Sequence, residues 1–151
     1  MKNIRFATLI LAGTLLLPCF AMASLGGNLA TVQADSARMK ASLRIARSES
    51  TYTVHELQSG SGTLVREYVA KNGTIFGVAW RGPVMPDLQQ VLGQYFTVLS
   101  DSGAVKRSSH AQMHVKKDDL VMHSSGHMRA FAGQAYLASQ LPQGVTAGDI
   151  Q

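Results

Sequence analysis

The chain has 151 residues, of which 46% are hydrophobic and 15% are charged, and its formal net charge at pH 7 is +5. This length supports one hydrophobic core, and two domains would be crowded. The sequence has no long run of Lys and Arg and no basic patch interleaved with aromatic residues, so nucleic-acid binding is not predicted.

Residues 1–23 have the pattern of a secretory signal peptide. Lys2 and Arg5 precede an apolar run that is too short to span a bilayer and that ends in the small-residue motif Ala-Met-Ala. We therefore expect cleavage between Ala23 and Ser24, export to the periplasm or the medium, and no transmembrane anchor in the mature protein.

The leader contains Cys19, the only cysteine of the chain. Lipidation needs Gly or Ala before the modified cysteine, and Pro18 stands there, which favours a mature protein without a lipid anchor. Cleavage would leave a cysteine-free domain that cannot form a disulfide. It would also remove two of the 14 basic residues, leaving 12 against 9 acidic ones and a net charge of +3.

The N-terminal segment, residues 24–50, shows two conflicting patterns. Val32 and Met39 lie on one helical stripe, and the alanine-rich composition favours a helix. Further along, however, apolar residues alternate as they do in a strand. We predict a helix over about 28–40 and leave 41–47 open between helix and strand.

The core domain, residues 51–142, begins with a predicted three-stranded antiparallel meander over 51–81. Two strand-like runs flank the loop Ser-Gly-Ser-Gly, and Asn72-Gly73 then predicts a two-residue type I′ turn into the third strand. The turn places Val65 opposite Trp80, Glu67 opposite Val78, and Val69 opposite Phe76. A four-residue loop at 59–62 similarly places Tyr52 opposite Val69, Val54 opposite Glu67, and Glu56 opposite Val65.

Pro83 and Pro86 end the meander, and an amphipathic helix is predicted over 86–100. Pro86 suits the first helical turn, and Asp87 complements the positive end of the helix. Apolar side chains then recur at helical spacing, at Leu88, Val91, Leu92, Tyr95, Phe96 and Leu99. We predict an α+β fold in which this helix covers one face of the antiparallel sheet.

The rest of the chain predicts shorter strands and a polar tail. Strands are expected over 112–115, 120–123 and 127–132, with turns at 117–119 and 124–126. Residues 133–139 either extend the last strand or form a helical turn, and 143–151 are expected to be a C-terminal tail on the surface.

Glu67 is the most unusual residue of the predicted sheet, because it lies on the face that the helix should cover. A buried carboxylate must be paired or protonated. In one interpretation Glu67 pairs with an arginine of the N-terminal helix, or its face is only partly covered. In the other, it lines a pocket with Trp80 and acts as an acid, a base or a ligand anchor.

The opposite face carries polar residues. The predicted pairing places Tyr68 against Gly77 and His55 beside Arg66. Together with Arg81 these side chains form either a weakly cationic surface for an anion or simply the solvated side of a two-layer domain.

Four histidines occur late in the chain, at positions 110, 114, 123 and 127. Their i, i+4 spacing would suit a helix, but positions i and i+4 of a strand are about 13 Å apart. We therefore predict no metal site and no cofactor, and retain His123 and His127 as weak metal candidates.

The serines do not form a G-x-S-x-G motif, and Glu56 with Glu67 is only a weak pair of glycosidase acids. An enzyme is therefore less favoured than a binding protein.

Several segments resemble one family over nearly the whole chain. They are ASLGG at the mature start, TVQADSARM, YTVHELQSGSGTLVREYVAKNGTIFGVAWRGPVMPDLQQVLGQYF, SGHMRAF and LPQGVTAGDIQ. The chain resembles the exported proteobacterial proteins of domain of unknown function 2844. This resemblance implies an exported bacterial protein without an assigned activity, and it transfers no catalytic or binding residues.

Three functions stay open. The first is a small exported binding protein whose partner is another exported or envelope protein or a small ligand. The second is a small exported hydrolase that uses Glu67 or a histidine. The third is a periplasmic metal-binding protein that uses the late histidines.

Overall fold

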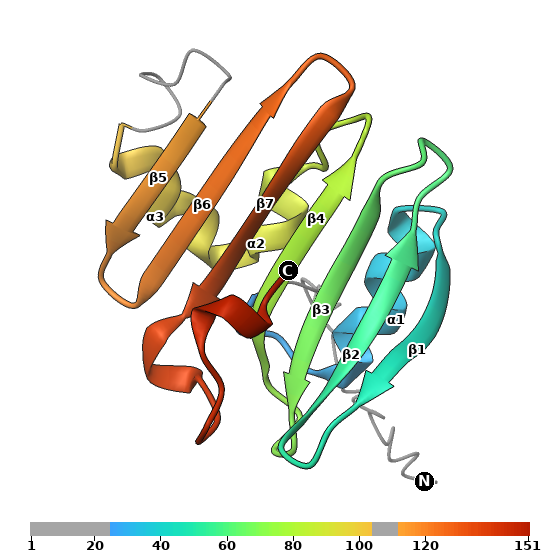
Figure 1. Ribbon diagram of the computed structural model, residues 1–151, viewed down its shortest axis with the longest axis vertical. Helices are drawn as coiled ribbons and strands as arrows, with labels where there is room; N and C mark the ends of the chain where they lie inside the picture. The colour runs from blue at the N-terminus through green and yellow to red at the C-terminus, as the bar shows by residue number, and fades with distance from the viewer. Residues whose placement is uncertain (1–24, 104–111) are drawn as a thin grey trace, which may run out of the picture.

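The computed structural model describes residues 25–103 and 112–151, and its centre is one seven-stranded antiparallel sheet in the order β1-β2-β3-β4-β7-β6-β5 (Figure 1). The strands are β1 (Ser42–Ser48), β2 (Tyr52–Gln58), β3 (Leu64–Ala70), β4 (Ile75–Gly82), β5 (Gln112–Lys117), β6 (Leu120–His127) and β7 (Ala130–Leu137). The predicted α+β class with an antiparallel sheet is confirmed. The predicted signal peptide and His110 lie outside the described residues.

The N-terminal segment contains both a helix and a strand. Helix α1 (Leu29–Arg38) begins after Asn28, whose side chain accepts a hydrogen bond from the backbone N–H of Ala30, and Thr31 completes a capping box. Residues 42–48 form the edge strand β1, which pairs with β2, so the segment left open between helix and strand at 41–47 is almost entirely strand.

The predicted register between β2 and β3 is wrong by one residue. Tyr52 pairs with Ala70, Val54 with Tyr68, and Glu56 with Arg66. The connecting loop comprises residues 59–63, because the backbone N–H of Ser59 bonds the carbonyl of Thr63 at 2.9 Å and keeps Thr63 out of the strand. A shift of one residue moves every side chain of a strand to the other face.

The turn between β3 and β4 is a bulged turn and not the predicted type I′ turn. Only Gly73 has positive φ, at +86°, whereas type I′ requires it at Asn72 as well. The bulge pairs Val69 with Ile75, not with Phe76, while Glu67 still faces Val78 as predicted. The other predicted pairs, Val65 with Trp80 and Tyr68 with Gly77, are confirmed, and Arg66 pairs with Ala79 between them.

The segment predicted as one helix over 86–100 is divided into three. Helix α2 (Leu88–Leu92) is capped by the Asp87 carboxylate, a 3₁₀ turn η1 follows (Gly93–Tyr95), and α3 (Phe96–Asp101) completes the segment. Gly93 has φ +53° and ends α2. The apolar residues keep their helical spacing on both sides of this glycine, so the spacing alone predicted one unbroken helix.

Strand β6 is longer than predicted. It runs through Ser124-Ser125-Gly126, predicted to be a turn, because these residues pair with β5 or β7 on both sides of the strand. The actual turn lies at Met128-Arg129, where Arg129 has φ +65°. Strand β7 extends to Leu137 and is followed by the 3₁₀ turn η2 (Ala138–Gln140).

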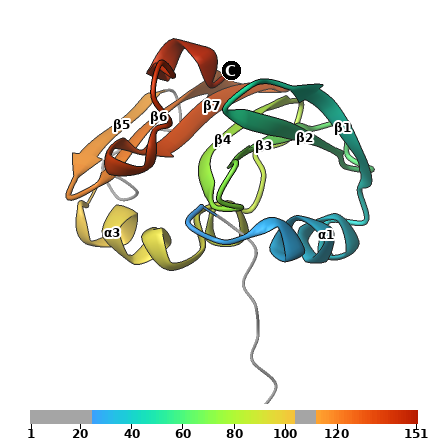
Figure 2. The ribbon, with the colours of Figure 1, turned by 90° about the horizontal axis from the view of Figure 1, so that it is seen from below.

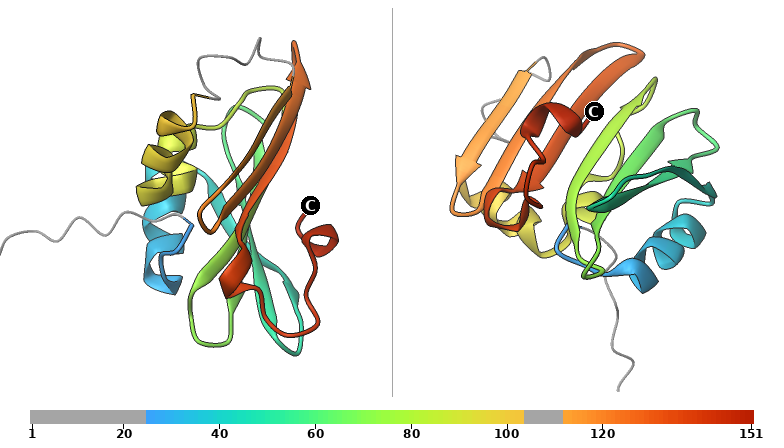
Figure 3. Two further views of the ribbon diagram at one scale, coloured as in Figure 1. Left: turned by 90° about the vertical axis from the view of Figure 1, so that its left-hand side faces the viewer. Right: turned by 60° about the horizontal axis from the view of Figure 1, so that its bottom comes forward.

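The sheet has two differently covered faces, shown edge-on in Figure 2 and from the side in Figure 3. The helix face packs against α1, α2 and α3, and its core includes Val32, Leu92 and Leu99. The tail face carries the C-terminal residues 138–151, which include the 3₁₀ turn η3 (Ala147–Asp149). In the described part of the chain, no helix is both long and apolar enough to cross a membrane.

The C-terminal tail is not confined to the surface as predicted. Ile150 is fully buried on the tail face, in a cluster with Tyr52, Tyr68 and Phe76. Its side chain lies over Gly77, where an added Cβ would be 2.9 Å from Ile150 Cδ1. The tail therefore forms the second, smaller core of the domain.

Replacing Gly133 with Ala should destabilise the domain by about 1 to 3 kcal/mol, because the new Cβ would lie 2.4 Å from Cζ2 of the buried Trp80 ring. Urea unfolding followed by circular dichroism measures the change. Gly60→Ala is the matched control, since no atom lies within 4 Å of the position its Cβ would take. Equal stability of the two variants would contradict the close packing of Trp80 on β7.

Candidate functional site

A groove of about 610 Å³ crosses the sheet from β3 to β5 and opens to solvent. We call it the tail-face groove, because most of its lining side chains point to the tail face by strand alternation. Its lining comprises Leu64, Arg66, Ala79, Trp80, Arg81, Gln112, Met113, His114, His123, Ser124, Ser125, Ala132, Gly133, Gln134 and Gln151.

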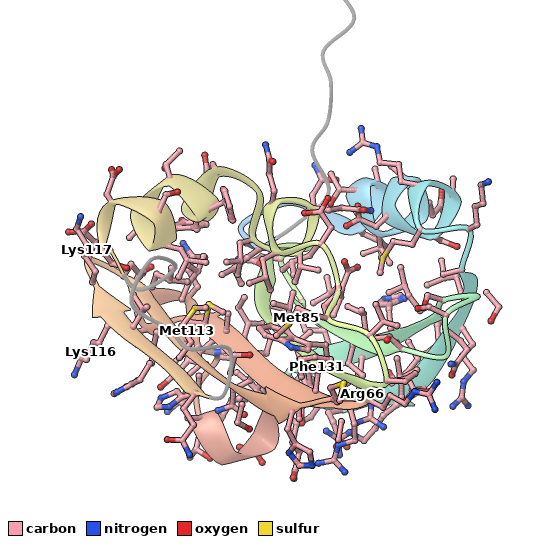
Figure 4. All side chains as sticks on the ribbon, turned by 90° about the horizontal axis from the view of Figure 1, so that it is seen from above. Arg66, Met85, Met113, Lys116, Lys117 and Phe131 are labelled. Atoms are coloured by element: carbon pink, nitrogen blue, oxygen red, sulfur yellow. The ribbon has the colours of Figure 1, made fainter. Side chains whose placement is uncertain are left out.

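The groove exists because small side chains occupy its middle. Ala79 of β4 pairs with Gln134 of β7, and Ala132 pairs with Arg81, so two alanines lie where larger residues would fill the space. The floor is therefore apolar, and longer polar side chains surround it. Figure 4 shows the two sides of the edge strand β5: Met113 lies on the helix side, and Lys116 points away from the helices.

One wall of the groove is held by an ion-pair network. Arg66 Nε donates to Glu56 Oε1 at 2.8 Å, and Arg44 pairs with the other oxygen of the same buried carboxylate. Arg66 Nη1 also donates to the backbone oxygen of Gln151 at 2.7 Å, and the Tyr68 hydroxyl donates to that oxygen at 2.8 Å. These contacts fix Arg66 and attach the tail to the wall.

The groove is cationic. Its lining includes two arginines and two histidines but no acidic residue. Arg66 is engaged by Glu56, whereas Arg81 is exposed and has no ion-pair or hydrogen-bond partner among the described residues. Arg81 is therefore the guanidinium available to an incoming anion.

Two histidines lie together at the β5 and β6 side of the groove. His114 pairs with His123 across the strands, and their rings stack with centroids 4.1 Å apart and planes 25° apart. His127 lies four residues further along β6, opposite Ala130. Within 25–103 and 112–151 there is no group of three or more His, Cys, Asp or Glu residues that is arranged to hold a metal ion.

Glu67 lies on the helix face and not in the groove. It is 2% exposed and meets Asp35 of α1, which is also 2% exposed, rather than an arginine. Burial raises the pKa of Asp35 to about 6, and Gln90 Nε2 donates to Asp35 Oδ1 at 3.2 Å. Burial, followed by the charge of Asp35, raises the pKa of Glu67 well above its usual value. The two carboxyls therefore hold a proton between them in a side-chain hydrogen bond.

The remaining predicted site residues are divided between the two faces. His55 pairs with Glu67 rather than lying beside Arg66, and burial lowers the pKa of its imidazole. Trp80 is 3% exposed, and its indole N–H has no hydrogen-bond partner in the described structure. His55, Glu67 and Trp80 thus belong to the helix side, whereas Arg66 and Tyr68 belong to the tail face.

The comparisons with known proteins identify the family. The model for "protein of unknown function (DUF2844)" matches residues 21–150, which cover most of the chain. The chain belongs to the DUF2844 family. No curated protein and no solved structure matches it.

Sequence reasoning missed several features of this DUF2844 domain. Asp35 was not recognised as the partner of Glu67, although its position on the same helical stripe as Val32 and Met39 indicated burial. The pairing of His114 with His123 depends on a turn at 118–119, within the predicted turn 117–119, but the sequence prediction did not place the two histidines opposite each other. No local pattern indicated the contact between Gln151 and Arg66, because 85 residues separate them.

Glu67→Gln should make this DUF2844 domain more stable at pH 8 and flatten its pH dependence. Unfolded carboxyls titrate near pH 4, whereas Asp35 and Glu67 hold their protons to higher pH in the folded state. Their stabilising contribution is therefore complete below about pH 4 and is lost as the pH rises through about 6 and beyond. Urea unfolding at pH 5 and pH 8 should show a loss of about 1 to 3 kcal/mol in the parent protein.

The control for this experiment is Glu49→Gln, which removes an exposed carboxylate that forms only a surface pair with Arg47. It should retain the pH dependence of the parent. A parent protein whose stability does not fall between pH 5 and pH 8, or a Glu67→Gln variant with an unchanged slope, would contradict a shared proton at this contact.

Proposed function

We propose that this protein is a small exported binding protein whose tail-face groove binds a small organic anion such as a carboxylate. The observation that carries the proposal is the groove itself, about 610 Å³ in volume, with two arginines, two histidines and no acid in its lining. Concave sites with an apolar floor and a few convergent polar groups are the usual form of small-ligand sites.

The chemistry of the lining favours an anion. The unpaired guanidinium of Arg81 offers two parallel N–H donors, the geometry that matches a carboxylate. Gln112, Gln134 and Ser125 add neutral donors along the groove. A ligand lying on the alanine floor would contact these groups from one side and solvent from the other.

Export is part of the proposal. The leader pattern at 1–23 supports secretion to the periplasm or the medium. The sequence resemblance to exported proteins pointed to the same family that the family model matches. A binding protein in that compartment would meet small anions and envelope proteins, so its partner is proposed from these two classes.

The hydrolase alternative receives less support from the geometry. Glu67 lies 2% exposed under α1 and lines neither the tail-face groove nor the second hollow near Gly93. A substrate would have to displace α1 to reach its carboxyl. The site that is open to a ligand is therefore on the other face of the sheet.

A protein partner has its best candidate surface at the edge strand β1. All seven residues of β1 are exposed, and Ile45 retains 66% of its surface, whereas the other edge, β5, ends in Lys116 and Lys117. Replacing Ile45 with Lys leaves the groove unchanged. A partner that is lost in Ile45→Lys and retained in Arg81→Gln would therefore bind the edge strand.

Arg81→Gln should weaken the binding of citrate, used as a tricarboxylate probe, by about tenfold or more, because a charge-assisted hydrogen bond contributes about 1.5 to 3 kcal/mol. NMR titration of the ¹⁵N-labelled mature protein measures the affinity and locates the shifts, which are expected at Arg81, Ser125 and Gln134.

Lys116→Gln is the matched control, since it removes the same charge from the same face but outside the groove lining. It should retain affinity within about twofold. The proposal is wrong if citrate shifts residues away from the groove, if it causes no shifts, or if the two variants weaken binding equally.

A further inference from the structure

The histidine pair in the lining of the tail-face groove has a geometry that suggests a second ligand, besides the positive character it can add to the proposed anion site. His114 of β5 and His123 of β6 are direct cross-strand partners, and their rings stack 4.1 Å apart. Both side chains are exposed, and neither forms a hydrogen bond or ion pair with any described residue. Two imidazoles with free ring nitrogens thus lie together on a rigid ladder.

We propose that His114 and His123 together bind a late first-row divalent metal ion, with Cu²⁺ preferred over Zn²⁺. Imidazole nitrogen is the ligand type that these ions favour, and affinity for a given nitrogen site is greater for Cu²⁺ than for Zn²⁺. The ladder fixes the two backbones, so only rotation of the exposed rings is needed to bring one nitrogen of each to the same ion. The protein supplies two ligands, and water or an anion completes the coordination.

Histidine stacking alone is a weaker explanation for this pair. Two protonated imidazoles with centroids 4.1 Å apart would repel each other, so the stacked arrangement favours rings that are not both charged. Neutral imidazoles are the form that binds metal. When the exposed rings rotate from this stacked arrangement so that one nitrogen of each points to the same position, an ion bound there accepts both lone pairs.

The surroundings set the expected selectivity and strength. The charged group nearest along β5 is Lys116, two residues from His114 on the same face, and the groove lining contributes no carboxylate. The site therefore lacks the carboxylates on which Mg²⁺ and Ca²⁺ sites are usually built, and the oxygens near it are neutral ones such as the side-chain amide of Gln134. With two protein ligands, it should bind more weakly than a four-ligand structural zinc site.

The test uses the untagged mature protein, because a polyhistidine tag would bind the same ions. Isothermal titration with CuCl₂ and ZnCl₂ should show one equivalent of Cu²⁺ bound more tightly than Zn²⁺, and no binding of Mg²⁺. Electron paramagnetic resonance of the Cu²⁺ complex should show nitrogen coordination. His114→Gln and His123→Gln should each weaken Cu²⁺ binding by at least tenfold, with unchanged circular dichroism.

His127→Gln is the control, because it removes an exposed histidine from the same strand outside the pair. It should retain the parent affinity. Equal Cu²⁺ binding in the parent and both pair variants, loss of binding in His127→Gln, or no binding to the parent would each overturn the proposal. None of these outcomes depends on citrate binding at Arg81, so the two proposals succeed or fail separately.

Discussion

The register between β2 and β3 determines the chemistry of both faces of the sheet. Because the loop contains residues 59–63, Glu56 lies on the tail face, where two arginines neutralise it, and His55 lies opposite Glu67 on the helix face. A loop shorter by one residue would exchange these positions and bury Glu56 under the helices. The hydrogen bond from the Thr63 hydroxyl to the carbonyl of Val84, at 2.6 Å, ties this loop to the end of β4 and holds the register.

Each face of the sheet has apolar side chains that must be buried, and the segments that bury them differ in the size of the core they form. The helix face is closed by α1, α2 and α3 around a large apolar core, within which the Asp35–Glu67 contact is a costly polar feature. The tail face is closed over only part of its area, by Ile150 among the aromatic rings. Beyond the tail, small side chains leave the sheet surface open. The groove is thus the part of the tail face that the second core does not reach.

The fold was predictable from sequence where local patterns determine it. Alternation identified the strands of the meander, and the helix α1 that Asn28 caps followed from composition and spacing. Three errors have physical causes that alternation does not reveal. Thr63 remained in the loop because of its hydrogen bonds, Gly93 ended a helix whose apolar spacing continued, and β6 continued through Ser-Ser-Gly because it has partners on both sides.

The candidate site was less predictable because it is assembled from five strands and the tail. Arg66 and Arg81 were recognised as possible anion ligands, but the groove between them and the histidines depends on the order β3-β4-β7-β6-β5. That order brings β7 between β4 and β6 and so places Arg81 and His123 on flanking strands of one floor. The family assignment supplies no activity, so function has to be inferred from this arrangement. Because backbone ladders hold the floor rigid, changing Arg81 or His123 should alter binding without altering the sheet, which makes the chemistry of each side separable by experiment.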